Sequence, residues 1–175
     1  ALLFLSLVVV LTGVLSLRYE SRTIAILGVV GAFITPVLLN GDMETSQRFI
    51  LLIYVVLVDI GILAVSVLRN WRWFTFIGLI ASYALFGLWR DQVPDGEVLV
   101  AQAGLTAILL IFVGATTIFH VKWRKIPGSF DLVLMTLNVA AYYVISIDLL
   151  WSEYESWLGA FTILLAAFYG VIAFS

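Results

Sequence analysis

Residues 49–68 read FILLIYVVLVDIGILAVSVL, a run of twenty residues with one charged side chain, Asp59, near its middle. A helix of this length rises about 30 Å, which is the thickness of the hydrocarbon core of a bilayer. Six further apolar runs cover residues 1–17, 23–39, 73–89, 98–119, 132–151 and 157–174. Barrel strands would be shorter and would alternate in polarity, so helices are expected. The predicted fold class is all-α, a polytopic transmembrane bundle of seven membrane-spanning helices.

The composition excludes a soluble protein. Of the 175 residues 63% are hydrophobic and 11% are charged, and the mean hydropathy is +1.16. A soluble domain carries about 25% charged residues. The chain has no cysteine, which excludes disulfides and thiolate metal sites, and its net charge of −2 argues against a nucleic-acid partner. Hydrolase, zinc-protease and phosphate-loop motifs are absent from the sequence, so we expect no enzymatic activity, no cofactor and no metal site.

The basic residues predict an orientation. Seven of the nine lie in the first, third and fifth connections: Arg18, Arg22, Arg69, Arg72, Lys122, Arg124 and Lys125. Because Lys and Arg accumulate in cytoplasmic loops, these connections should lie inside. From this count we expect both ends of the chain to face outward. Residues 1–175 should form a single transmembrane helical domain, a piece of a longer multi-spanning protein, since the chain opens without methionine and stops after an apolar run.

Small residues indicate where helices approach closely. Lipid tails are as apolar as Leu, so helix association in a membrane depends on faces where backbones can meet. Such faces have spacings of three and four residues on the second and seventh runs, and they include Ala25, Gly28, Ala32, Gly159, Ala166 and Gly170.

Asp59 is the strongest candidate for a functional residue. A charge at the bilayer centre costs at least about 2.5–3.5 kcal/mol, and no Lys, Arg or His lies inside the seven runs to pair with it. We therefore expect a neutral carboxyl that donates a hydrogen bond to Ser82 or Tyr83, which lie at similar depth on the next helix. Three interpretations remain open. Asp59 serves proton-coupled movement of a substrate, its hydrogen bond joins two helices, or it pairs with a residue of the longer protein outside residues 1–175.

Four other polar features suggest sites. Thr35 and Pro36 lie near the outer end of the second run, where proline frees carbonyls that a cation or substrate can use, or simply ends the helix. Gln102 and Asp148, both near the outer surface, are candidates to line a vestibule, although polar residues are tolerated at the interface. Asn138 is expected to bond a neighbouring helix.

His120 is the only histidine in the chain. A lone imidazole can ligate a pigment or haem, which makes His120 a candidate cofactor ligand. Its place at the end of the fifth run, beside Lys122 and Arg124, equally suits a solvated residue in a basic cluster that contacts anionic headgroups.

Residues 17–41, LRYESRTIAILGVVGAFITPVLLNG, resemble the signature of a family of predicted bacterial multi-spanning membrane proteins of unknown function. Its pattern is a basic-aromatic-acidic-Ser-Arg turn and a helix ending Gly-Gly-Phe-Leu-Thr-Pro-Leu-Leu. The turn at Trp71–Trp73 and the LFGLW ending at Trp89 continue the match, which is compositional from Val98 onward. Ala32 replaces the second glycine. The resemblance implies a multi-pass protein of the bacterial inner membrane and carries no activity.

Two functions are compatible with these features. We expect a structural or accessory subunit that packs in the lipid bilayer against other transmembrane helices or membrane-protein subunits. The alternative is a transporter-like protein that moves a small or amphipathic substrate past Asp59 and the Thr35–Pro36 break.

Overall fold

The computed structural model describes residues 2–38, 45–69, 71–90, 93–94, 96–123 and 128–173. These ranges are helical apart from short connections. The helices are α1 (Leu2–Tyr19), α2 (Arg22–Leu38), α3 (Thr45–Arg69), α4 (Arg72–Arg90), α5 (Val98–Trp123), α6 (Ser129–Tyr154), the 3-10 turn η1 (Glu155–Trp157) and α7 (Leu158–Ala173).

The all-α prediction is confirmed, since each apolar run corresponds to one helix. Several helices extend beyond their runs: α3 begins four residues before Phe49, and α6 extends three residues past Trp151. An apolar run marks only the part of a helix that suits hydrocarbon, whereas a helix can continue among headgroups. Five described helical segments are long and apolar enough to cross a membrane: α3, α4, α5, α6, and η1 together with α7. The count of seven spans stays a prediction.

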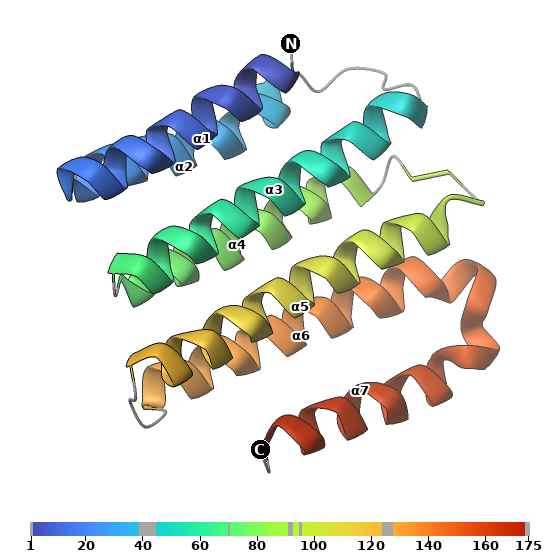
Figure 1. Cartoon of the computed structure of the whole chain (residues 1–175). Coiled ribbons are helices and arrows are strands. Elements are labelled where there is room, and N and C mark those ends of the chain that lie inside the picture. The colour runs from blue at the N-terminus through green and yellow to red at the C-terminus, as the bar shows by residue number, and fades with distance from the viewer. Residues whose placement is uncertain are drawn as a thin grey trace.

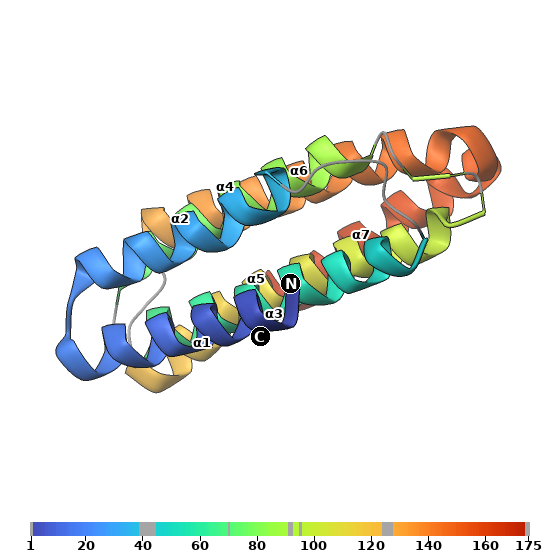
Figure 2. The same cartoon turned by 90° about the horizontal axis from the view of Figure 1, so that it is seen from above.

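The helices form two layers, which Figures 1 and 2 show together. One layer holds α1, α3, α5 and α7, and the other holds α2, α4 and α6. Helices that follow each other in the chain pack against each other. In addition, α3 packs against α1 and α5, and α4 packs against α2 and α6. Because short connections join antiparallel helices, the layers alternate along the chain.

The alternating direction bears on the expected orientation. The start of α1 and the end of α7 lie toward opposite ends of the bundle (Figure 1). If all seven helices cross the membrane, the two chain ends lie on opposite sides of it. The seven-span count and the prediction that both ends face outward therefore exclude each other, and both stay predictions.

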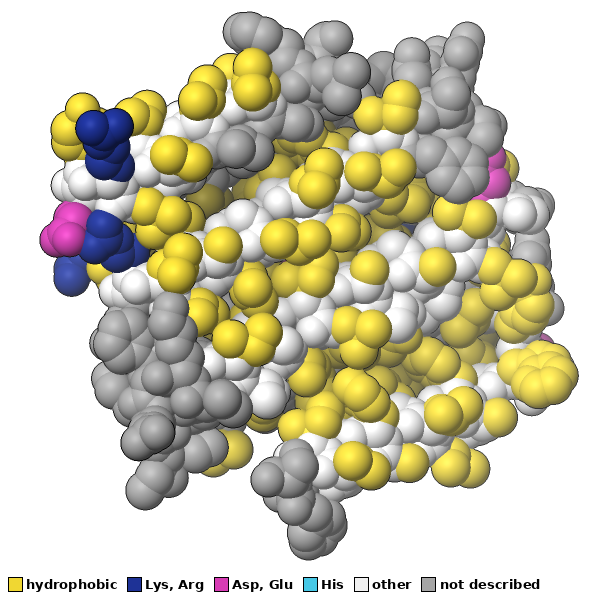
Figure 3. Space-filling model, in the orientation of Figure 1, with side chains coloured by type: hydrophobic (Ala, Val, Ile, Leu, Met, Phe, Trp, Pro, Cys, Tyr) yellow, Lys and Arg dark blue, Asp and Glu magenta, His cyan; other side chains and the backbone are white. Residues whose placement is uncertain are grey.

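The core lies between α3, α4, α5 and α6. Leu79, Leu105 and Phe112 are among its most deeply buried side chains. α7 is the least buried of the five long helices. Hydrophobic side chains cover the broad face formed by α1, α3 and α5, and basic side chains gather at the end where α1 meets α2 (Figure 3). The side chains of Arg48, Lys122, Arg124 and Lys125 lie outside the described residues.

Candidate functional site

Asp59 faces α4 from the middle of α3 and is completely buried. Ser82 Oγ donates a hydrogen bond to Asp59 Oδ1, and the same hydroxyl lies 2.9 Å from the carbonyl oxygen of Gly78. A serine hydroxyl carries one proton, so Ser82 shares it between Asp59 Oδ1 and the Gly78 carbonyl oxygen. Asp59 Oδ2 has no hydrogen-bond partner among the described residues. The structure thus brings Asp59 and Ser82 together.

Tyr83 does not share this site. Its hydroxyl donates to Asn138 Oδ1 on α6 at 2.8 Å, and Asn138 Nδ2 donates to the carbonyl of Leu109 on α5 at 3.2 Å. Consecutive residues of a helix point about 100° apart, so Ser82 and Tyr83 face different neighbours. Of the two residues expected near Asp59, Ser82 forms the hydrogen bond with it and Tyr83 bonds Asn138 instead. Asn138 bonds neighbouring helices, as its depth predicts.

Pro36 lies inside α2, which continues to Leu38. A proline has no N–H, so the carbonyl four residues earlier, that of Ala32, loses its helical donor. The hydroxyl of Tyr54 on α3 replaces the missing donor and donates to the Ala32 oxygen at 2.9 Å. Thr35 Oγ1 donates to the carbonyl of Gly31 at 2.7 Å. The carbonyl proposed for a cation or substrate is thus occupied by a buried tyrosine.

Gln102 and Asp148 also take part in contacts between helices. Gln102 Nε2 donates to Tyr142 Oη and to Ser146 Oγ on α6, both at 3.0 Å, and Thr106 Oγ1 lies 3.0 Å from Tyr142 Oη. Asp148 forms an ion pair with Arg90 of α4. Three residues of this network were not recognised from the sequence: Thr106, Tyr142 and Ser146. The sequence does carry a signal for them. Gln102 and Thr106 on α5 are four residues apart, as are Tyr142 and Ser146 on α6, and this spacing places each pair on one face of its helix.

Two arginines, at the end of α3 and the start of α4, join helices at the basic end of the bundle. Arg69 pairs with Glu20 at 2.5 Å and also donates to the carbonyl of Leu17. Arg72 pairs with Asp131, which is 3% exposed and accepts a hydrogen bond from the Gly128 amide at 2.8 Å. Asp131 was not recognised from the sequence, because an acidic residue at the start of a helix is usually exposed.

The small residues of α2 and α7 lie in different surroundings. Ala25 and Ala32 are buried, and a Cβ added to Gly28 would lie 2.8 Å from Thr12 Oγ1 of α1. Gly159 and Ala166 are exposed, and Gly159 and Gly170 have open space where a Cβ would stand. The small-residue face of α2 thus packs closely against α1. The small-residue face of α7 is largely exposed among the described residues.

Among the described residues, no group of three or more His, Asp or Glu side chains is placed to hold a metal. The His120 backbone belongs to α5, but its side chain lies outside the described residues, so its candidate role as a cofactor ligand lies outside them too. The described polar groups of the interior mostly join one helix to another.

Comparison with known proteins assigns the family. The model of a family described as predicted membrane protein (DUF2339) matches residues 1–175. No curated protein and no solved structure matches the chain. The family description and the apolar helices both place the chain in a lipid bilayer. The chain therefore belongs to the DUF2339 family of predicted membrane proteins.

Proposed function

We propose that the chain is a non-catalytic structural or accessory subunit of a larger assembly in the bacterial inner membrane. The observation that carries this proposal is the enclosure of Asp59, the strongest candidate for a functional residue, against Ser82 of the next helix. A carboxyl in this position stabilises the contact between α3 and α4. It offers no exposed atom to a substrate.

The occupied carbonyl at Pro36 supports the same function. Transporters with interrupted helices leave backbone carbonyls available to bind ions. Here Tyr54 already donates to the Ala32 oxygen. The hydrogen bond that Pro36 removes from α2 is thus replaced by one between α2 and α3.

α7 offers the surface for partner helices. Its small residues, Gly159 and Ala166 among them, are exposed, and small residues allow the backbone of a second helix to approach. We place the contact with a partner subunit on this face.

The test is gentle detergent extraction of the chain from native membranes, followed by size analysis and mass spectrometry. Stable partners in fixed stoichiometry are expected, and Ala166→Leu should reduce their recovery. Ala167→Leu is the matched control, because Ala167 is also exposed but points about 100° away around α7. A particle that contains only this protein and lipid would contradict the proposal.

One observation favours the alternative, a transporter-like protein that moves a small or amphipathic substrate with protons. Asp59 Oδ2 is buried and has no hydrogen-bond partner among the described residues, so no hydrogen bond holds a proton on this oxygen in place. Proteoliposomes loaded with a pH-sensitive dye test this function. If the wild-type chain moves protons and Asp59→Asn abolishes the movement without lowering the thermal unfolding midpoint, transport replaces the accessory function.

A further inference from the structure

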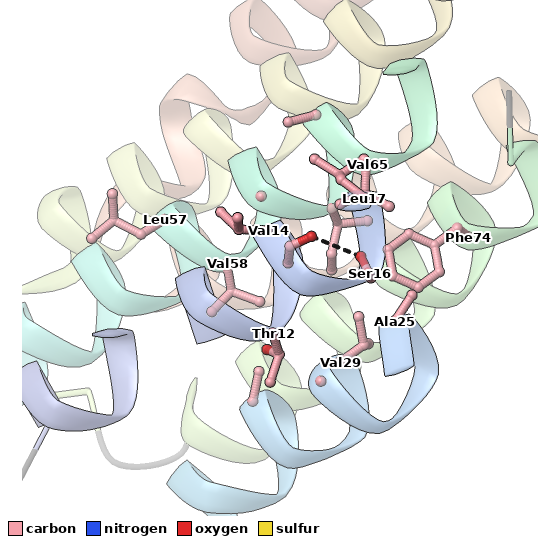
Figure 4. A pocket seen from close by; sticks show the side chains of 16 residues that line it. Thr12, Val14, Ser16, Leu17, Ala25, Val29, Leu57, Val58, Val65 and Phe74 are labelled. Atoms are coloured by element: carbon pink, nitrogen blue, oxygen red, sulfur yellow. Dashed lines mark hydrogen bonds between the residues drawn. The ribbon is translucent and has the colours of Figure 1, made fainter. Parts of the chain in front are cut away.

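An apolar groove of about 230 Å³ lies between α1, α2 and α3 (Figure 4). Its walls include Val14, Val29, Val58, Val65 and Phe74. The volume exceeds the roughly 150 Å³ of an engineered apolar cavity that binds benzene. It is therefore large enough for part of an organic ligand.

The groove offers almost no free polar group. Its two hydroxyls already donate within their own helix: Thr12 Oγ1 to the Val8 carbonyl at 3.0 Å, and Ser16 Oγ to the Gly13 carbonyl at 2.8 Å. A polar ligand would lose its hydrogen bonds to water without replacement. The chemistry of the walls selects a hydrocarbon.

The groove opens between α1 and α3, where the surface in Figure 3 is hollowed. Val14 and Leu57, which line it, are 55% and 53% exposed. In a bilayer this opening faces lipid tails. An unfilled void would forfeit dispersion contacts along its walls, so a neighbouring tail fills it.

The depth of the groove matches one leaflet. Counted along α3 from Arg69, Val65 and Leu57 lie about 6 and 18 Å away, at about 1.5 Å per residue. The hydrocarbon core is about 30 Å thick, so the groove runs from the basic end to near the midplane. A transmembrane helix would need a groove along the whole bundle, whereas a lipid tail from one leaflet needs only this length.

Two arginines stand at the basic end of the groove. Arg18 lies one turn beyond Val14 on α1, and Arg22 lies one turn before Ala25 on α2. Both are exposed, and neither forms an ion pair with an acidic residue in the part of the chain that the structure describes. The guanidinium of Arg22 lies 5.8 Å from the centre of the Trp71 ring. Glu20, the acidic residue between them in sequence, pairs with Arg69.

We propose that this groove binds an anionic glycerophospholipid, with one acyl chain between α1, α2 and α3 and the phosphate at Arg18 and Arg22. Guanidinium groups bind phosphate oxygens in pairs, and basic pockets between helices select anionic headgroups. A tail gains little from leaving other tails. The arginines therefore supply the selectivity, and the groove fixes the position of the lipid.

The test is native mass spectrometry of the full chain released from nanodiscs that contain equal parts of phosphatidylcholine and phosphatidylglycerol. The wild-type chain should retain phosphatidylglycerol preferentially. Arg18→Gln with Arg22→Gln should lower that retention at least about fivefold, the contribution of one basic residue near an anionic surface, and leave phosphatidylcholine unchanged. Glu20→Gln removes an opposing charge at the same turn, so it should raise phosphatidylglycerol retention.

A second pair of variants tests the groove itself. Gly61 lines the groove with open space around it, so Gly61→Leu should displace the tail and lower retention of both lipids. Gly31→Leu is the matched control, because Gly31 on α2 also has open space around it but does not line the groove. Equal thermal midpoints of the two variants show that folding is preserved.

Three results would overturn the lipid site. Gly61→Leu retaining lipid like the wild type would place the lipid elsewhere. Equal retention of the two lipids by the wild-type chain would remove the role of the arginines. A dimer that is lost in Gly61→Leu would show that a second copy of the chain, and not a lipid, occupies the groove.

Discussion

At the residue scale, Asp59 and Ser82 form a hydrogen bond whose contribution to stability is measurable. Each of Asp59→Ala and Ser82→Ala should lower the free energy of unfolding by about 1–2 kcal/mol, the upper range for hydrogen bonds between membrane helices. Both variants remove the same contact, so the double variant should cost little more than either single one. Denaturant unfolding in detergent micelles measures the cycle. Additive losses would show that the two side chains act independently.

Asp131 and Glu20 form ion pairs of unequal burial at the same end of the bundle. Asp131→Asn should cost about 2–3 kcal/mol, because it leaves Arg72 partly buried beside a neutral amide. Glu20→Gln should cost less than about 1 kcal/mol, because its pair with Arg69 is largely exposed. The same unfolding measurement compares the two. Equal losses would contradict the assignment of Asp131 to the interior.

At the element scale, Gly78 and Gly87 lie on the same helix, α4, and differ in their neighbours. A Cβ on Gly78 would lie 2.8 Å from Ile62 Cγ2 of α3, whereas nothing lies within 4 Å of a Cβ on Gly87. Gly78→Ala should therefore destabilise the fold by about 1–3 kcal/mol through overpacking. Gly87→Ala should be neutral or stabilise it by up to about 1 kcal/mol, the difference in helix propensity. A thermal midpoint that falls equally in both variants would contradict this.

The contact between Tyr54 and the carbonyl freed by Pro36 allows a second test at this scale. Tyr54→Phe should cost about 1–2 kcal/mol, since it leaves the Ala32 oxygen buried without a donor. In a Pro36→Ala background the amide of residue 36 can donate to that oxygen, so the same change should cost clearly less. Unfolding of the four chains in micelles provides the comparison. An unchanged cost in the alanine background would show that Tyr54 acts through its ring contacts alone.

At the scale of the whole molecule, the orientation is testable because the chain has no cysteine. Single cysteines at Tyr19 and Ser129 mark the end of the bundle with the basic turns, and single cysteines at Pro94 and Glu155 mark the opposite end; all four positions are exposed. From the distribution of Lys and Arg, a membrane-impermeant maleimide should label the latter pair in intact cells and the former only in inverted vesicles. If the maleimide labels Tyr19→Cys and Ser129→Cys in intact cells instead, the basic end of the bundle lies outside and the predicted orientation is wrong.

The sequence predicted some features of the candidate site and missed others for identifiable reasons. The partner of Asp59 was found among two neighbours, because depth along a helix follows from counting residues. Tyr54 was missed, since nothing in its local sequence shows that it faces a carbonyl more than twenty residues earlier. Seven spans and two outward-facing ends were both predicted from the sequence, and these two predictions exclude each other, because an odd number of crossings places the chain ends on opposite sides of the membrane.

The sequence by itself determined that the chain forms apolar helices, where they begin and end to within a few residues, which end of the bundle is basic, and to which family the chain is similar. Only the tertiary structure decided that Tyr83 meets Asn138, that Tyr54 satisfies the Ala32 carbonyl, and that α1, α2 and α3 enclose a groove. Helices apolar on every side can rotate about their axes in lipid at little cost in hydrophobic free energy. Which faces meet therefore depends on side-chain fit and on hydrogen bonds between residues far apart in the chain.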